Sequence, residues 1–209
     1  PTHAGSFDTT YLSTLPNFIV MAASDEAELV RMINTSTEIN NRPCAFRYPR
    51  GTGLGSILPP INEKIEIGKS KIIKEGKKLA ILNFGARLNE TLKAAENLSK
   101  KGLPITVIDA RFAKPLDENL IWQLATTHEA IMTIEEGSIG GFGSHVVDFL
   151  TKKGLIDSNL KFRALTLPDI FIDQDTPDKM YKLANLDSVS IEEKVLDLLN
   201  SNIVLKKQN

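Results

Sequence analysis

The chain has 209 residues and a formal net charge of −1, with 25 basic and 26 acidic side chains. This balance excludes the strong positive field typical of nucleic-acid-binding domains. The chain holds one cysteine, which excludes an internal disulfide, and no apolar run approaches the roughly 18 residues needed to cross a membrane. We therefore expect one large or two small globular domains, with neither nucleic acid nor a membrane as a partner.

The first quarter of the chain predicts a strand, a helix and a second strand. Residues 18–22 are all apolar, which indicates a buried strand. Ser24 precedes two acidic residues and an apolar pattern with helical spacing, so we expect a helix capped by Ser24 and running to about residue 39. A second short strand is expected at 45–48, ended by Pro49.

A break in this pattern follows. Residues 51–60 contain three glycines and two prolines, which is typical of a linker, and we place a domain boundary there. Residues 64–74 alternate apolar and polar side chains around Gly68 and predict a β-hairpin. The lysines in this stretch are interpreted as a solvated sheet edge, because lysine protects edge strands against pairing with other chains.

The remainder of the chain alternates strands with helices, which indicates a mostly parallel sheet with helices on both faces. The expected strands are residues 79–84, 105–108, 131–134 and 162–167. Helical stripes follow the first three of these strands, and two short helices are expected after Pro177 and Ser188. Asp117 is expected to cap the second of the helices.

Two residues are candidates for chemistry. His3 lies in the opening loop Pro-Thr-His-Ala-Gly, where it could approach a ligand closely or simply be an exposed loop histidine. Arg47 and Arg50 lie at the carboxyl end of the strand at 45–48, the end at which α/β sheets bind ligands. Pro49 interrupts the strand and directs Arg50 into the loop, where its guanidinium fork suits a phosphate, whereas Arg47 is expected to pair with a carboxylate structurally; a surface ion pair is the alternative for either arginine.

Other patterns carry weaker signals. The glycines of residues 140–144 precede a helix but lack the spacing of a dinucleotide fingerprint and the lysine of a P-loop. Glu135 and Glu136 are adjacent and should face opposite sides of a strand, so we interpret both as structural. One cysteine and three scattered histidines assemble no metal site.

Three segments together resemble the 1-deoxy-D-xylulose-5-phosphate synthase family of thiamine-diphosphate enzymes. They are Pro-Thr-His-Ala-Gly-Ser-Phe-Asp at 1–8, Arg-Tyr-Pro-Arg-Gly at 47–51 and Asp-Ala-Arg-Phe-Ala-Lys-Pro-Leu-Asp at 109–117. The resemblance covers nearly the whole chain. It implies an α/β fold with the end of a pyrimidine-binding domain at 1–55, a linker at 56–68, and a transketolase C-terminal-like domain with a five-stranded sheet at 69–209.

The resemblance also implies roles for the two candidates. His3 would hydrogen-bond the oxyanion of the thiamine-bound intermediate, and Arg50 would contact the phosphate of glyceraldehyde 3-phosphate, which reacts after pyruvate is decarboxylated. The intact enzyme would be a homodimer using thiamine diphosphate and Mg²⁺ for isoprenoid, thiamine and pyridoxal precursors. The Gly-Asp-Gly segment and the glutamate that hold this cofactor lie upstream of the matching region, so this chain alone is expected to bind no cofactor and to be inactive without the missing N-terminal portion.

Three alternatives remain open at this point. The chain could come from a transketolase, or from the β-subunit of a 2-oxoacid dehydrogenase, although the segments at 47–51 and 109–117 favour the synthase. It could also act as a non-catalytic dimerisation module. A bacterial cytoplasm is the expected location, with a plastid as the alternative.

Overall fold

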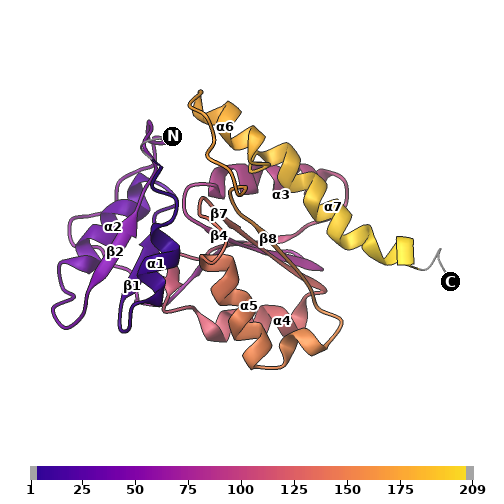
Figure 1. The fold of residues 1–209 in the computed structure, drawn as a ribbon, viewed down its shortest axis with the longest axis horizontal. Coiled ribbons are helices and arrows are strands. Elements are labelled where there is room, and N and C mark those ends of the chain that lie inside the picture. The colour runs from indigo at the N-terminus through magenta and orange to yellow at the C-terminus, as the bar shows by residue number, and fades with distance from the viewer. Residues whose placement is uncertain (1–3, 206–209) are drawn as a thin grey trace.

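The computed structural model describes residues 4–205. Figure 1 shows two units side by side, a smaller one built from the start of the chain and a larger one in which helices cover both faces of a sheet. The mixed α/β class and the five-stranded sheet of the larger unit confirm the predicted fold.

The smaller unit is a three-stranded sheet with the order β2-β1-β6. Strand β1 (Ile19–Ala22) runs parallel to β2 (Cys44–Arg47) and antiparallel to β6 (Phe112–Lys114), which comes from the second half of the chain. Helices α1 (Asp8–Thr14) and α2 (Glu26–Ser36) pack against this sheet. Strands β1 and β2 confirm the two strands predicted here, whereas α1 and β6 were not predicted.

The cap of α2 differs from the prediction. Asp25, not Ser24, is the N-cap residue, and its Oδ1 accepts a hydrogen bond from the backbone N–H of Glu28 at 2.7 Å. The Ser24 hydroxyl instead donates to Oδ2 of the buried Asp109 at 2.6 Å. The expectation failed because a partner 85 residues away in sequence takes the hydroxyl.

The larger unit is a five-stranded sheet with the order β3-β5-β4-β7-β8. All neighbouring strands are parallel except β3 and β5, which confirms the mostly parallel sheet. Its strands are β3 (Lys71–Lys74), β4 (Leu79–Phe84), β5 (Thr106–Asp109), β7 (Ala130–Glu135) and β8 (Lys161–Leu165). All six residues of β4 and all six of β7 are buried, as expected of central strands covered on both faces.

Helices enclose this sheet from both sides (Figure 1). They are α3 (Leu88–Lys100), α4 (Glu118–Thr127), α5 (Phe142–Lys152), the 3₁₀ helix Leu155–Asp157, α6 (Pro177–Leu183) and α7 (Ser188–Leu205). Leu82 and Phe84 pack in the cluster under α4 and α5, while Leu79 and Ile81 pack in the cluster under α3 and α7. Alternate residues of β4 thus pack into two apolar cores on opposite faces of the sheet. Burying each large side chain there stabilises the folded state by about 1.5–3 kcal/mol.

Two predictions concern the helices that cover this sheet. Asp117 caps α4, since its Oδ1 accepts from the N–H of Leu120 at 3.3 Å, which confirms the predicted cap. Helix α7 is long rather than short.

The predicted hairpin at 64–74 is wrong. Residues 61–70 form no strand, and β3 pairs instead with β5. The alternation arose because Ile65 is buried beside α2, where its N–H donates to Thr35 Oγ1 at 3.0 Å. Lys71 does lie exposed on β3, at the edge of the larger sheet, as the lysine pattern indicated.

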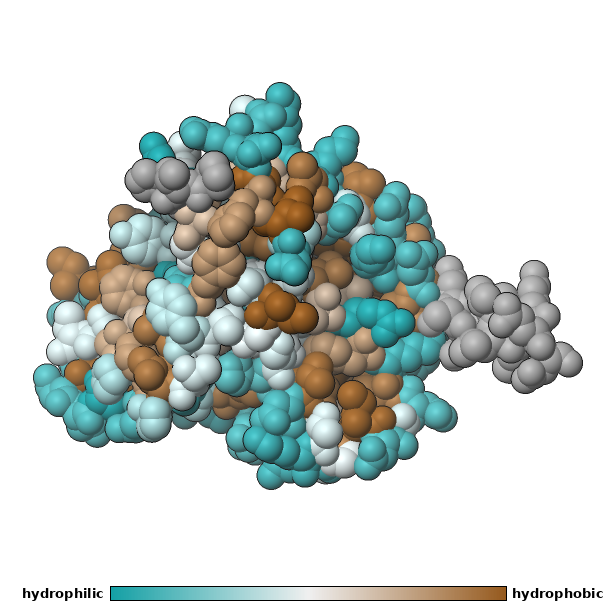
Figure 2. Space-filling view, in the orientation of Figure 1, coloured by the Kyte–Doolittle hydropathy of each residue, from teal (hydrophilic) through white to brown (hydrophobic). Residues whose placement is uncertain are grey.

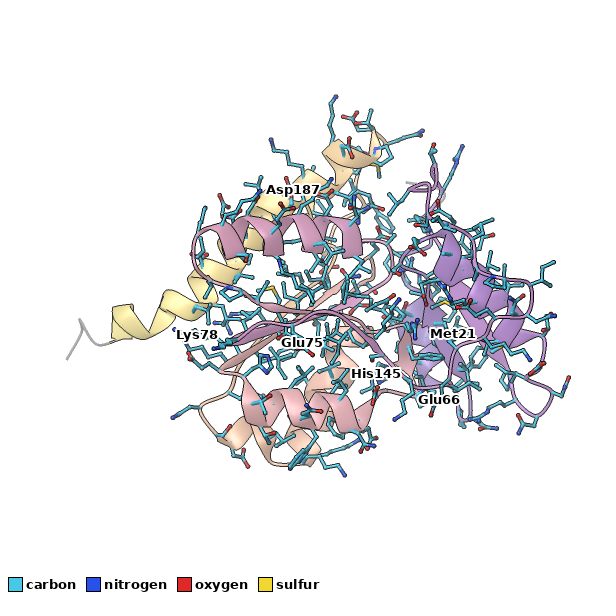
Figure 3. All side chains as sticks on the ribbon, turned by 180° about the vertical axis from the view of Figure 1, so that it is seen from behind. Met21, Glu66, Glu75, Lys78, His145 and Asp187 are labelled. Carbon is cyan, nitrogen blue, oxygen red and sulfur yellow. The ribbon has the colours of Figure 1, made fainter. Side chains whose placement is uncertain are left out.

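The two units meet at one end of the larger sheet. In Figure 3, Met21 of β1 marks the smaller unit, and Lys78, which precedes β4, marks the opposite end of the larger sheet. The carboxyl ends of β4 and β7 therefore face the smaller unit. The domain borders at residues 55 and 69 stay predictions, although β6 lies beyond them in sequence and completes the smaller sheet.

Candidate functional site

Arg47 fixes the carboxyl end of β2 in two directions. Its Nε lies 3.2 Å from Asp8 Oδ2 at the start of α1, and its Nη1 donates to the backbone carbonyl of Glu136 at 2.7 Å. Arg47 thus joins the opening segment, β2 and the end of β7. This confirms the prediction that Arg47 pairs structurally with a carboxylate.

Arg50 lies three residues further on, in a bend of the chain, and is exposed. No ion pair or side-chain hydrogen bond within residues 4–199 involves its guanidinium. An exposed guanidinium without a protein carboxylate beside it can accept an anionic ligand, and its planar fork suits a phosphate. The role of Arg50 stays a prediction.

His3 lies outside the described residues, so its predicted role is untested. The segment that follows it is anchored against the larger unit. Ser6 accepts a backbone hydrogen bond from Ser138 at 3.1 Å, and the rings of Phe7 and Phe171 meet edge to face with centroids 6.2 Å apart. The opening motif therefore leads directly to the end of the sheet where Arg47 and Glu136 meet.

A shallow pocket lies where the two sheets approach each other. It is lined by residues at the carboxyl ends of β1, β2, β4 and β7, namely Ala22, Ala23, Arg47, Tyr48, Pro49, Phe84, Gly85, Ala86 and Glu136. Gly85 has a φ of +91°, and a Cβ atom there would lie 3.3 Å from the Cβ of Ala22. A glycine at this turn lets the strand ends of the two units approach closely.

Glu136 organises one wall of this pocket. Its Oε1 accepts from Arg87 Nε at 2.8 Å, and the Arg87 guanidinium stacks 3.4 Å from the ring centroid of Tyr181. Burial, together with the nearby Glu136 carboxylate, raises the pKa of Tyr181 well above its usual range. The phenol therefore stays protonated at neutral pH, and Arg87 links Glu136 to the Tyr181 ring.

The glycine-rich turn before α5 is already occupied by an internal anion. The Glu135 carboxylate accepts from the N–H groups of Phe142 and Gly143 at 3.0 and 2.9 Å. Cβ atoms at Gly137 and Gly141 would lie 2.5 and 2.3 Å from Glu135 Oε2, so both glycines make room for this carboxylate. Glu135 and Glu136 thus bind different partners, as expected of residues that face opposite sides of a strand, and the glycines of residues 140–144 are explained by the Glu135 carboxylate.

A buried polar cluster at the junction of the two units was not predicted. Asp109 is 1% exposed and accepts from Ser24, while Arg111 lies beside Glu28 of α2, with Nη2 donating to Oε1 at 2.9 Å. Arg111 Nε and Glu28 Oε2 are also 2.9 Å apart, an ion pair without the alignment of a hydrogen bond. Burial raises the pKa of Asp109 to about 7, although the hydrogen bond from Ser24 opposes this shift.

The described residues offer no metal site. Within them, no three His, Cys, Asp or Glu side chains gather closely enough to hold a metal ion, and His128 and His145 lie in different elements. Residues 4–205 also contain no helix with the length and apolar character that a membrane span requires.

Comparisons with known proteins give two family matches along the chain. Residues 68–191 match the family model described as the transketolase C-terminal domain, and residues 1–53 match the transketolase pyrimidine-binding domain. Among solved structures, the chain is similar to a split-gene transketolase in an inactive β4 tetramer, with a TM-score of 0.82 and 27% sequence identity. The match covers 92% of this chain and 61% of that one, so this chain spans about three fifths of the length of its neighbour.

Proposed function

Because the chain belongs to the transketolase family, we propose that it forms part of a thiamine-diphosphate-dependent 1-deoxy-D-xylulose-5-phosphate synthase. In this proposal the enzyme decarboxylates pyruvate and joins the two-carbon unit to glyceraldehyde 3-phosphate. Residues 47–51 and 109–117 favour the synthase over other family members, since these segments carry the resemblance to it.

The observation that carries the proposal is the position of Arg50. The residue follows a strand whose carboxyl end faces the other sheet, and its neighbour Arg47 is already neutralised by Asp8. Arg50, three positions beyond that strand end, is exposed. A bidentate grip on the phosphate of glyceraldehyde 3-phosphate fits a guanidinium in this setting.

The cofactor of the family requires more than the described residues. When bound, thiamine diphosphate supplies the nucleophilic carbon that attacks pyruvate. Among the described residues, no three His, Cys, Asp or Glu side chains lie together as a metal site built from them would require. We propose that another segment, on the same polypeptide or a separate one, provides the diphosphate site, and that His3 reaches the thiamine from this chain.

A second candidate is a self-associating, inactive subunit. The similar chain of the split-gene transketolase was solved as an inactive β4 tetramer, which supports association of this chain with its own copies in the absence of another segment. A transketolase, or a 2-oxoacid dehydrogenase β-subunit, would fit the two family matches equally well. Substrate choice distinguishes these candidates.

The test is an activity assay of the full chain, alone and together with a segment that carries the family's diphosphate site. Formation of 1-deoxy-D-xylulose 5-phosphate from pyruvate and glyceraldehyde 3-phosphate is expected only in the combined sample. Arg50→Ala should raise KM for glyceraldehyde 3-phosphate by about 10- to 100-fold, the effect of losing a charged hydrogen bond, and leave KM for pyruvate unchanged.

Arg163→Ala is the matched control, because Arg163 is an exposed arginine on β8. It should leave both KM values unchanged. Transfer of a two-carbon unit from a ketose phosphate, with no reaction of pyruvate, would replace the proposed synthase by a transketolase. Synthase activity of this chain alone would contradict the need for another segment.

A further inference from the structure

The chain between β2 and β3 contains no helix or strand, and it carries Arg50 close to its start. Such a long irregular segment needs anchors if it is to hold a side chain in one place. Arg47 is the first anchor, through Asp8 and the carbonyl of Glu136. The structure contains a second anchor that neither the sequence patterns nor the family matches indicate.

This second anchor is Glu26, the first residue of α2. Its Oε2 accepts from the N–H of Leu54 at 3.0 Å, and its Oε1 accepts from the N–H groups of Gly55 and Ser56 at 2.5 and 2.8 Å. The Ser56 hydroxyl donates to Oδ2 of the neighbouring Asp25 at 2.9 Å. Three successive backbone donors thus converge on one carboxylate at the start of a helix, where the dipole also favours a negative charge.

The glycines of the segment are suited to this contact. A Cβ atom on Gly53 would lie 2.9 Å from both Cδ and Oε1 of Glu26, so any larger residue would push the carboxylate away. Gly55 has a φ of +82°, a conformation that other residues adopt only with strain. The backbone hydrogen bonds also hold the pKa of Glu26 below its usual value, so the contact persists across the neutral pH range.

Arg50 lies midway between the two anchors. It lies three positions after Arg47 and four positions before Leu54, the first residue that Glu26 holds, and four residues of extended chain span at most about 14 Å. The first isoleucines beyond the second anchor do not hold the loop, since Ile57 and Ile61 are 94% and 89% exposed, and the chain is next buried at Ile65. Figure 2 shows brown, apolar surface recurring on both units rather than gathered in one patch.

We propose that Glu26 is a positioning residue for Arg50, holding residues 54–56 so that the guanidinium is presented at one place for the substrate phosphate. This inference rests on the proposed function of Arg50. Fixing the loop in advance removes part of the conformational entropy that phosphate binding would otherwise cost. Glu26 itself touches no substrate, so its loss should weaken phosphate recognition without changing the chemical step.

The first test measures the loop alone. In Glu26→Gln one acceptor oxygen becomes an NH₂ group, which cannot accept from the loop and leaves the size of the side chain unchanged. Amide hydrogen exchange at residues 54–56 of the full chain should accelerate by about tenfold, as expected for losing one hydrogen bond of this kind. Glu38→Gln is the control, because Glu38 is an exposed partner of Lys64 and should leave this exchange unchanged.

The second test measures the enzyme completed by its diphosphate-binding segment. Glu26→Gln should raise KM for glyceraldehyde 3-phosphate by about fivefold with kcat within about twofold, since the loop still reaches its position part of the time. The double variant Glu26→Gln/Arg50→Ala should be no worse than Arg50→Ala, because Glu26 acts through Arg50. Additive losses would overturn the positioning role.

Gly53→Ala disrupts the same contact from the side of the loop, and it provides a test if Glu26→Gln fails to fold. It should reproduce both the faster exchange and the higher KM. Unchanged exchange in both variants would overturn the inference outright. Faster exchange with unchanged KM, while Arg50→Ala does raise KM, would overturn only the link between the loop and the phosphate. An Arg50→Ala variant with normal KM would instead refute the proposed function, and this inference with it.

Discussion

The two units of the molecule are built on the same kind of parallel strand but are held together differently. In the larger unit, the central strands β4 and β7 are buried at every residue, and apolar clusters fill both faces of the sheet. In the smaller unit, β2 is only half-buried at all four residues and forms the edge of its sheet. Its surroundings are tied by carboxylate contacts from Asp8, Asp25, Glu26 and Glu28.

This difference separates stability from recognition. The apolar unit provides a scaffold whose energy comes from buried surface, which is insensitive to pH and salt. The smaller unit also has an apolar core around β1, but the residues with candidate roles, Arg50 and Glu26, lie at its edge, where charges and hydrogen bonds hold the chain. We therefore expect variants in the core of the larger unit to lower stability, and variants of Arg50 and Glu26 at the edge of the smaller unit to change binding first.

The largest effect should come from the core of the larger unit. Phe84 is 1% exposed and stacks on Phe142 with ring centroids 5.1 Å apart. Phe84→Ala should lower the free energy of unfolding by about 3–5 kcal/mol, because it leaves a cavity between the sheet and its helices. The half-buried Phe46 of β2 is the comparison, and Phe46→Ala should cost about 1–2 kcal/mol. Equal decreases in unfolding free energy for the two variants, measured by urea unfolding, would contradict this contrast between the units.

The junction of the units should give the next largest effect. Glu28 is 4% exposed and faces both Arg31 and Arg111. Glu28→Gln removes a buried carboxylate and leaves the partly buried Arg111 without its counter-charge, which should cost about 3 kcal/mol of unfolding free energy. The control Glu38→Gln removes an exposed pair with Lys64 and should cost less than about 1 kcal/mol. A small effect at Glu28 would show that the junction charges are solvated.

The smallest effect is a dependence of stability on pH through Asp109. Burial raises its pKa in the folded protein to about 7, above the ordinary value of 3.8, so the folded state binds the proton more tightly between these values. Stability should therefore fall as the pH rises towards 7 and level off above it. Relative to Asp109→Asn, the unchanged protein should lose about 2 kcal/mol between pH 5 and pH 8. A pH-independent difference between the two would contradict this assignment.

Local patterns predicted the larger unit well. Strand β4 could be found because its apolar residues are continuous, and the cap at Asp117 because it bonds within its own helix. The prediction of a hairpin at 64–74 was wrong because the alternation of apolar and polar residues around Ile65 arises from packing against α2, not from strand pairing. Strand β6 was missed because a three-residue strand has almost no local signature and exists only through its pairing with β1.

The candidate site was predicted only in part. Arg47 could be recognised as structural from its place in β2, and Arg50 as exposed from the proline before it. Glu26 was interpreted only as a first-turn acid of a helix, because its contacts with Leu54 and its neighbours lie 28–30 residues away. The polar cluster around Asp109 was not predicted for the same reason, since Ser24, which donates to Asp109, is distant from it in sequence. Contacts of this range need the fold to be known.

Because β6 pairs with β1, the limits of the two family matches do not coincide with the limits of the two sheets. The C-terminal match at 68–191 contains Phe112–Lys114, yet those residues hydrogen-bond to β1 within the pyrimidine-binding match at 1–53. A recombination that exchanged the C-terminal part between relatives would therefore also replace one strand of the sheet it was meant to leave intact. Relatives are interchangeable at this border only if their β1 and β6 sequences are compatible, a constraint on how these two modules can diverge.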